Sequence, residues 1–189
     1  SMDAFATLGL PRQAALDSEF LKAAYAERCR LTHPDQASGD EAQSADLNTA
    51  FETLSAPEKR LKHLLSLEAG DQAAWKTVPL DAAMMDLFSK IGPFLQNLTA
   101  HAKKKETAAS ALAKALLSSA EMKLQEQAES LGAELSALRE TLEAELPPLD
   151  EKRRLGDSNV FSELHCVQAK LAYVAKWQAQ IREAFLTLA

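Results

Sequence analysis

The residues best suited to chemistry are the tripeptide His33-Pro34-Asp35, which lies between two predicted helices. Pro34 fixes one backbone torsion of the connecting loop, so the side chains on either side are displayed at low entropic cost. The Asp35 carboxylate can accept a paired hydrogen bond from an arginine of another protein. The His33 imidazole can donate or accept one. The tripeptide therefore predicts a loop that docks on a protein partner, with a plain turn between helices as the alternative.

Catalysis and metal binding are not expected of this chain. No second histidine, cysteine or carboxylate pair lies near His33 at ligand spacing. Cys29 and Cys166 are far apart in sequence, and we expect two reduced, largely buried thiols. No nucleophile–base pair stands at useful spacing. The sequence thus favours a protein that is not an enzyme and needs no cofactor.

The elements that must position the tripeptide are helices. Residues 5–10 suggest a short opening helix or turn before Pro11. Asp17 or Ser18 can cap a second helix that runs on to Thr32, because Pro34 disfavours helical backbone at the residue before it. A third helix begins between residues 41 and 45 and continues through leucines at three- to four-residue spacing as far as Leu67.

Helical periodicity resumes after a connector at residues 69–79. We expect a helix from Leu80 that is kinked or broken at Gly92-Pro93, then a long helix over 103–146 that Pro147-Pro148 ends. A last helix over 160–188 can be capped by residues 157–159. Each helix has one apolar stripe to bury, so residues 80–189 predict an antiparallel bundle of three helices. An intermolecular coiled coil is the alternative for the long seam.

Composition agrees with an all-α chain of 189 residues, with a helical domain at 3–68, a linker at 69–79 and the bundle at 80–189. Gly and Pro number only 6 and 7, and 47% of residues are apolar. The net charge of -6 argues against nucleic acid as the main partner. No apolar run approaches the roughly 20 residues that span a bilayer, so we expect no membrane partner and a cytoplasmic location. Lys103-Lys104-Lys105 favours a solvated helix face or terminus over a site for an anionic partner.

The first domain resembles the J-domain (DnaJ-like) family. The resemblance covers about residues 3–67 and rests on His33-Pro34-Asp35, on Tyr25, on the FATLGL segment at 5–10 and on the run from Leu47 to Arg60. It implies a co-chaperone that docks on the ATPase of a DnaK-type chaperone and promotes hydrolysis. The implied docking residues are His33, Pro34, Asp35, Lys22, Tyr25 and Arg30. An ordinary solvated face is the alternative for Lys22 and Arg30, and Gln36 stands where the family usually has lysine.

The whole chain resembles the HscB type of J-protein, the iron–sulfur cluster co-chaperones. It has no Gly/Phe-rich linker and no Cys-x-x-Cys module, and residues 62–67 lead directly into an all-helical tail. This resemblance implies an HscA-type ATPase as partner and an iron–sulfur scaffold protein bound by Met84, Met85 and Phe88. Bundle core is the alternative for these three residues, and Ser89 and Gly92 stand about where the family shows glutamate.

Three functions therefore remain open. The first is an HscB-like co-chaperone that delivers a cluster scaffold. The second is a J-domain adaptor for a different client. The third is a helical interaction protein with a degenerate J-domain, with which Gln36 and Glu27 are consistent.

Overall fold

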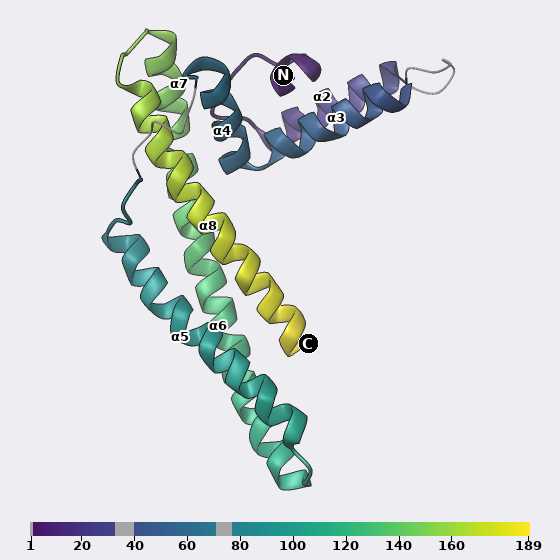
Figure 1. Ribbon diagram of the computed structural model, residues 1–189, viewed down its shortest axis with the longest axis vertical. Coiled ribbons are helices and arrows are strands. Elements are labelled where there is room, and N and C mark those ends of the chain that lie inside the picture. Colours follow the sequence, from purple (N-terminus) through teal and green to yellow (C-terminus); the bar gives the residue numbers. More distant parts are fainter. Residues whose placement is uncertain (1, 33–39, 71–76) are drawn as a thin grey trace. The chain divides into compact units, whose positions relative to one another are not determined.

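The computed structural model describes residues 2–32, 40–70 and 77–189, and this part of the chain is helical without any strand (Figure 1). The all-α prediction is confirmed. None of the helices in these ranges is long and apolar enough to cross a membrane. The helices are α1 Ala4–Thr7, α2 Ser18–Leu31, α3 Asp40–Ser55, α4 Pro57–Glu68, α5 Ala82–Thr107, α6 Ala111–Glu143, α7 Leu146–Arg154 and α8 Val160–Leu188.

The chain forms two compact units, and each is built from two separate stretches of sequence. The first comprises Ser1–Val78 and Leu142–Ala172, and the second comprises Pro79–Thr141 and Tyr173–Ala189. The stretch 142–172, which we assigned to the C-terminal bundle, thus belongs to the compact unit of the N-terminal helices. One physical reason is a set of polar contacts from α7, described below.

The N-terminal helices begin where the sequence predicts. The Asp3 carboxylate accepts hydrogen bonds from the N–H groups of Phe5 and Ala6 at the start of α1. The Asp17 carboxylate accepts the N–H of Phe20 at 3.0 Å and caps α2. These side chains satisfy N–H groups that have no partner within the helix.

The predicted third helix is two helices in the structure. Ala56 is extended, with φ −97° and ψ 119°, and Pro57 opens α4 as its first residue. Proline clashes with helical backbone at the residue before it, whereas its missing N–H is not needed in a first turn. The expected continuous helix to Leu67 is therefore wrong, although the leucines fall on the expected faces of α3 and α4.

We expected Gly92-Pro93 to kink or break its helix, and the break does not occur. Pro93 lies inside α5, which continues through Gly92-Pro93 to Thr107 without a break. A helix-interior proline costs about 3 kcal/mol, and here the buried stripe of Ile91, Phe94 and Leu98 offsets it. Pro147 and Pro148 lie in the first turn of α7, a helix that the sequence reading missed.

The long helix predicted over 103–146 is also divided. Residues 103–107 end α5, and a turn at 108–110 leads into α6, where the Ser110 hydroxyl accepts the N–H of Ala113 at 3.0 Å. Lys104 and Lys105 lie in the last turn of α5, where cations favour the carbonyl end of a helix. The predicted last helix at 160–188 has the bounds observed for α8.

The core of the second unit is the three-helix bundle of α5, α6 and α8, as predicted. Residues from all three helices are buried, among them Met84, Leu87, Ile91, Phe94, Leu124, Leu131, Leu135, Val174, Trp177 and Ile181. The two cysteines are free, but only Cys29 is half-buried, and Cys166 is exposed. The expectation of two buried thiols is therefore wrong for Cys166, which lies on the outer side of α8.

Candidate functional site

The helical hairpin of α2 and α3 frames the segment that contains the predicted docking loop. The rings of Tyr25 on α2 and Phe51 on α3 are 4.5 Å apart, and the Tyr25 hydroxyl donates a hydrogen bond to Asn48. His33, Pro34 and Asp35 lie outside the described residues. Tyr25 is half-buried against α3, so it joins the two helices while keeping part of its ring accessible.

The predicted basic residues of α2 are exposed, and each pairs with an acid on its own helix. Lys22 is 63% exposed and lies 3.4 Å from Glu19, and Arg30 is 68% exposed and lies 2.7 Å from Glu27. The hydrogen bond from Arg30 lowers the pKa of the Glu27 carboxyl below its ordinary value. Exposed pairs of this kind contribute little to stability, so both cations can exchange their acids for carboxylates of a partner.

Arg28, the third cation of α2, lies in a different place. Its guanidinium covers Gly9 so closely that a Cβ on Gly9 would overlap it. Gly9 has φ +68°, a left-handed conformation that residues with a Cβ adopt only at a cost. Arg28 therefore packs on the turn after α1, away from Lys22 and Arg30.

Arg60 has a structural role. Its side chain is 4% exposed and donates to the carbonyl oxygens of Ala14 at 2.8 Å and Leu54 at 2.7 Å. These bonds tie the corner between α3 and α4 to the segment that precedes α2. The residues that resembled the J-domain family thus include both surface positions such as Lys22 and internal supports such as Arg60.

Helix α7 braces the same segment from outside the hairpin. The Asp150 carboxylate accepts the N–H groups of Ala14 at 2.7 Å and Ala15 at 2.8 Å. Arg153 donates to Glu68 at 2.6 Å and to the carbonyl oxygen of Arg12 at 2.5 Å. No sequence signal marked this contact, because it joins residues about 136 positions apart through backbone groups.

The predicted scaffold-binding residues separate into core and surface. Met84 is 0% exposed and belongs to the bundle core, as the alternative interpretation held, so it cannot contact a partner. Met85 and Phe88 are 52% and 53% exposed. The Phe88 ring lies 6.2 Å from the ring of Trp177 on α8.

Two aromatic residues that the sequence reading left out belong to this surface. Tyr173 is 37% exposed and lies 6.0 Å from Trp177, which is 4% exposed and fills the space between α5 and α8. Their spacing of four residues places both on one side of α8. We define the α5–α8 face as Met85, Phe88, Tyr173 and the edge of Trp177.

Lys90, two residues after Phe88 on α5, is already paired with two acids. Lys90 lies 3.2 Å from Asp86 and 2.9 Å from Glu134 of α6, and these contacts raise the pKa of Lys90. Within the described ranges, no group of three or more His, Cys, Asp and Glu side chains could hold a metal ion. The chemistry that this face offers is therefore apolar contact.

Comparison with known proteins identifies the N-terminal part of the chain. Residues 3–63 match the family model of the DnaJ domain. These residues are a DnaJ domain. The match begins before α1 and ends in α4, so it includes Lys22, Tyr25, Arg30 and the tripeptide at 33–35.

The DnaJ-domain chain is similar over its length to two solved structures. One is the chaperone HscB from Vibrio cholerae, with 21% identity, a TM-score of 0.61 and coverage of 100% of both chains. The other is the human co-chaperone protein HscB, with 20% identity, a TM-score of 0.53 and coverage of 96% of this chain and 81% of that one. The expected fold, a J-domain followed by an HscB-like helical part, is confirmed. The roles of individual residues remain predictions.

Proposed function

We propose that this J-domain protein is a co-chaperone that stimulates the ATPase of a DnaK/HscA-type chaperone. The observation that carries the proposal is the DnaJ domain at residues 3–63, which contains His33-Pro34-Asp35 between α2 and α3. The supporting surface consists of Lys22 and Arg30 on α2, whose only described partners are weak pairs on the same helix.

The proposed docking is electrostatic and local. Asp35 would accept hydrogen bonds from an arginine of the ATPase, while Lys22 and Arg30 would contact its acidic residues. Exposed charges are screened by salt, so stimulation should weaken as ionic strength rises. Tyr25 would add apolar contact at the rim, since it is half-buried against Phe51.

The test is single-turnover ATP hydrolysis by a DnaK/HscA-type chaperone, with and without this protein. Asp35→Asn removes the charge and should abolish stimulation without loss of helicity in circular dichroism. Glu52→Gln, an exposed acid on α3, is the matched control and should stimulate as the parent does. If Asp35→Asn stimulates fully, the docking role is wrong.

For the client, we propose that the α5–α8 face binds an iron–sulfur scaffold protein, which this co-chaperone would deliver to the ATPase. The support is the resemblance to HscB proteins together with an exposed methionine and phenylalanine over an aromatic base. Exposed apolar and aromatic side chains that cluster in this way are typical of protein interfaces.

Scaffold binding can be measured by calorimetry with the purified scaffold. Phe88→Ala and Met85→Ala should each weaken binding by about tenfold, the effect of truncating an apolar anchor. Phe20→Ala and Met122→Ala remove side chains of similar exposure (57% and 61%) elsewhere and should bind as the parent does. Absence of binding, combined with normal ATPase stimulation, would favour an adaptor for another client.

A further inference from the structure

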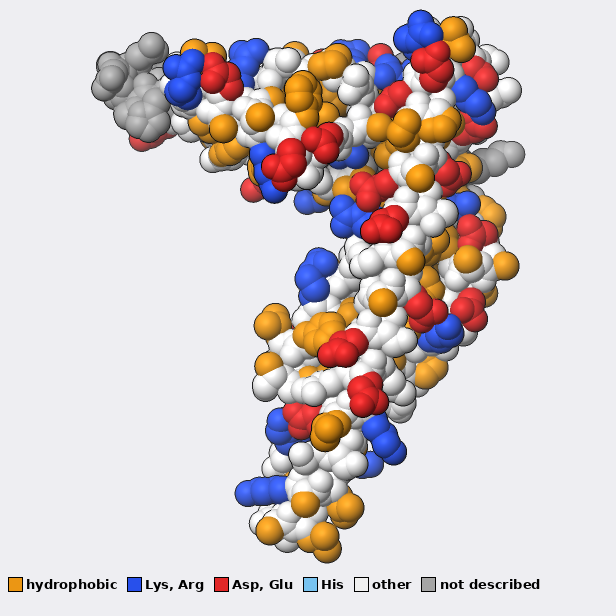
Figure 2. Space-filling view, turned by 180° about the vertical axis from the view of Figure 1, so that it is seen from behind, with side chains coloured by type: hydrophobic (Ala, Val, Ile, Leu, Met, Phe, Trp, Pro, Cys, Tyr) orange, Lys and Arg blue, Asp and Glu red, His pale blue; other side chains and the backbone are white. Residues whose placement is uncertain are grey.

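The distal end of the α5–α6 hairpin has an apolar surface that no described helix covers. In the second unit, α8 ends beside the middle of α6, where the Gln125 amide donates to the carbonyl oxygen of Leu188 at 3.3 Å. The hairpin continues past this point to its turn at 108–110 (Figure 1). Leu112 and Leu116 are 71% and 66% exposed there, and hydrophobic side chains gather at this tip in Figure 2.

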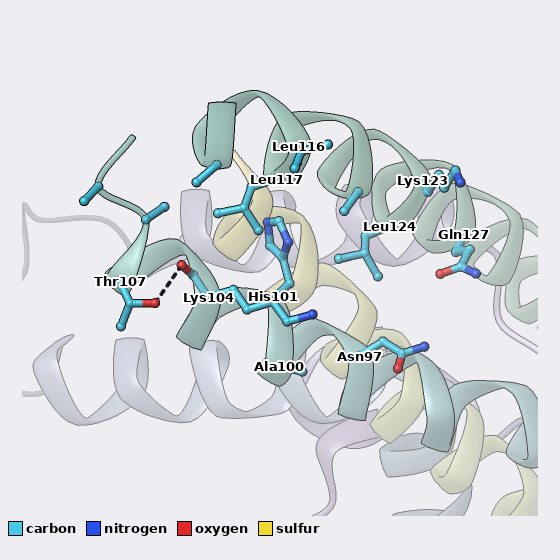
Figure 3. A pocket seen from close by; sticks show the side chains of 14 residues that line it. Asn97, Ala100, His101, Lys104, Thr107, Leu116, Leu117, Lys123, Leu124 and Gln127 are labelled. Atoms are coloured by element: carbon cyan, nitrogen blue, oxygen red, sulfur yellow. Dashed lines mark hydrogen bonds between the residues drawn. The ribbon is translucent and has the colours of Figure 1, made fainter. Parts of the chain in front are cut away.

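A groove of 710 Å³ runs between α5 and α6 in this region (Figure 3). On α5 its wall extends from Asn97 to Thr107, which corresponds to about 15 Å at 1.5 Å per residue. Gln125 and Gly132, which meet α8 at Leu188 and Ile181, do not line it. The groove therefore lies beside the contact with α8.

The shape of the groove suits a helix. Its walls are two antiparallel helices, and small side chains allow close approach of a third backbone: Ala100, Ala108, Ala109, Ala113 and Ala120. Leu116 and Leu117 supply the larger apolar contacts. About three helical turns would fill the groove, with side chains at i, i+3, i+4 and i+7 pointing into it.

The positive charge of the groove favours an acidic partner. Lys104 on the α5 rim and Lys123 on the α6 rim are exposed, and neither makes an ion pair within the described part of the chain. None of the lining residues is acidic. The adjoining groove, which shares Asn97 and Gln127, instead has Lys90 neutralised by Glu134 at 2.9 Å. Of these two grooves, the distal one has lysines without a described ion-pair partner, whereas the lysine of the other is paired.

We infer that the distal groove binds an amphipathic helix of a partner protein, with carboxylates along both edges of its apolar stripe. Lys104 and Lys123 would pair with these carboxylates, while Leu116 and Leu117 would pack on the stripe. A second copy of this chain fits poorly, because a symmetric contact would bring the two lysine rims together. This site is separate from the DnaJ domain and from the α5–α8 face.

The test uses the full chain and three labelled peptides of 14 residues in fluorescence anisotropy. The acidic peptide has leucines at helical spacing and glutamates on both edges. The basic peptide has lysines in place of the glutamates, and the third peptide is a scrambled version of the first. The parent should bind the acidic peptide at least tenfold more tightly than the other two. Lys104→Glu combined with Lys123→Glu should reverse the preference between the acidic and basic peptides.

A second part of the test blocks the distal groove with a bulky side chain. Ala120→Trp fills the groove without changing charge and should weaken acidic-peptide binding at least tenfold. Ser119→Trp places the same side chain on the exposed helix surface outside the groove and should bind as the parent does. Circular dichroism checks that each variant is folded.

Several outcomes would overturn the inference. They are equal binding of the acidic and scrambled peptides, no binding at millimolar peptide, or equal effects of the two tryptophan variants. Binding to phosphatidylglycerol vesicles in place of the peptide would assign the groove to lipid. Dimerisation in light scattering that Ala120→Trp abolishes, without peptide binding, would assign it to a second copy.

Discussion

Removal of the Asp150 carboxylate tests whether α7 braces the segment before α2. This carboxylate accepts the N–H groups of Ala14 and Ala15 at 2.7 and 2.8 Å, and its side chain is 19% exposed. Asp150→Ala would leave both N–H groups without their acceptor. Arg153 would keep Glu68 at 2.6 Å as its ion-pair partner.

The expected loss of unfolding free energy in Asp150→Ala follows from the two hydrogen bonds. A bond to a charged group contributes about 1.5–3 kcal/mol net. Because water can reach part of this site, the lower value applies to each, and the loss is about 3 kcal/mol in total. For a chain of this length, 1 kcal/mol shifts the melting temperature by about 2–4 °C. We therefore expect Asp150→Ala to melt about 6–12 °C lower.

Thermal unfolding followed by far-UV circular dichroism measures the effect. The control is Glu151→Ala, which removes the neighbouring exposed carboxylate, whose described partner is Arg154 on the same helix. That variant should melt close to the parent. If the two variants have the same melting temperature, the N–H groups of Ala14 and Ala15 find equivalent partners when the Asp150 carboxylate is removed. That result would refute the bracing role of α7.

Three further predictions concern the DnaJ domain. Gly9→Ala forces a residue with a Cβ to φ +68°, so chemical denaturation should show a loss of about 1–2 kcal/mol. Arg60→Ala removes two buried hydrogen bonds and should lower the unfolding free energy by about 2–4 kcal/mol in the same assay. Burial lowers the pKa of His63, whose Nε2 accepts the N–H of Ala4 at 3.0 Å. Below about pH 6.5 the His63 imidazole takes up a proton more readily in the unfolded chain than in the folded one. Stability should therefore decrease as the pH is lowered, and it should decrease less steeply in His63→Gln.

Local sequence signals predicted the N-terminal elements well. Asp17 was expected as a cap because it lies directly before an apolar periodic segment, and caps of this kind act over three or four residues. The cap at Asp3 was not predicted. The two helices that became α2 and α3 also followed from apolar spacing together with Pro34, whereas their pairing as a hairpin was implied by the family resemblance. Pro57 was the exception, because its restriction on Ala56 was overlooked among leucines that keep helical spacing.

Signals that depend on tertiary context were misread. Pro93 is tolerated because α5 buries a long stripe on its other face, which the dipeptide itself does not reveal. Trp177 was not singled out in the sequence, although helical spacing places it on the same side of α8 as the buried Val174 and Ile181. The support of the N-terminal segment by Asp150 had no signal at all, since the acceptor meets backbone groups rather than a complementary side chain.

The composite make-up of the first unit bears on how the DnaJ domain can be studied. Its buried leucines come from both stretches of the unit, with Leu142, Leu146, Leu149 and Leu164 belonging to the second. A fragment that stops at residue 78 would lack these leucines, together with the acceptor for Ala14 and Ala15. Such a fragment is expected to aggregate and to be only marginally folded. Supplying residues 142–172 in trans, or joining them by a short artificial linker, should restore a soluble reagent.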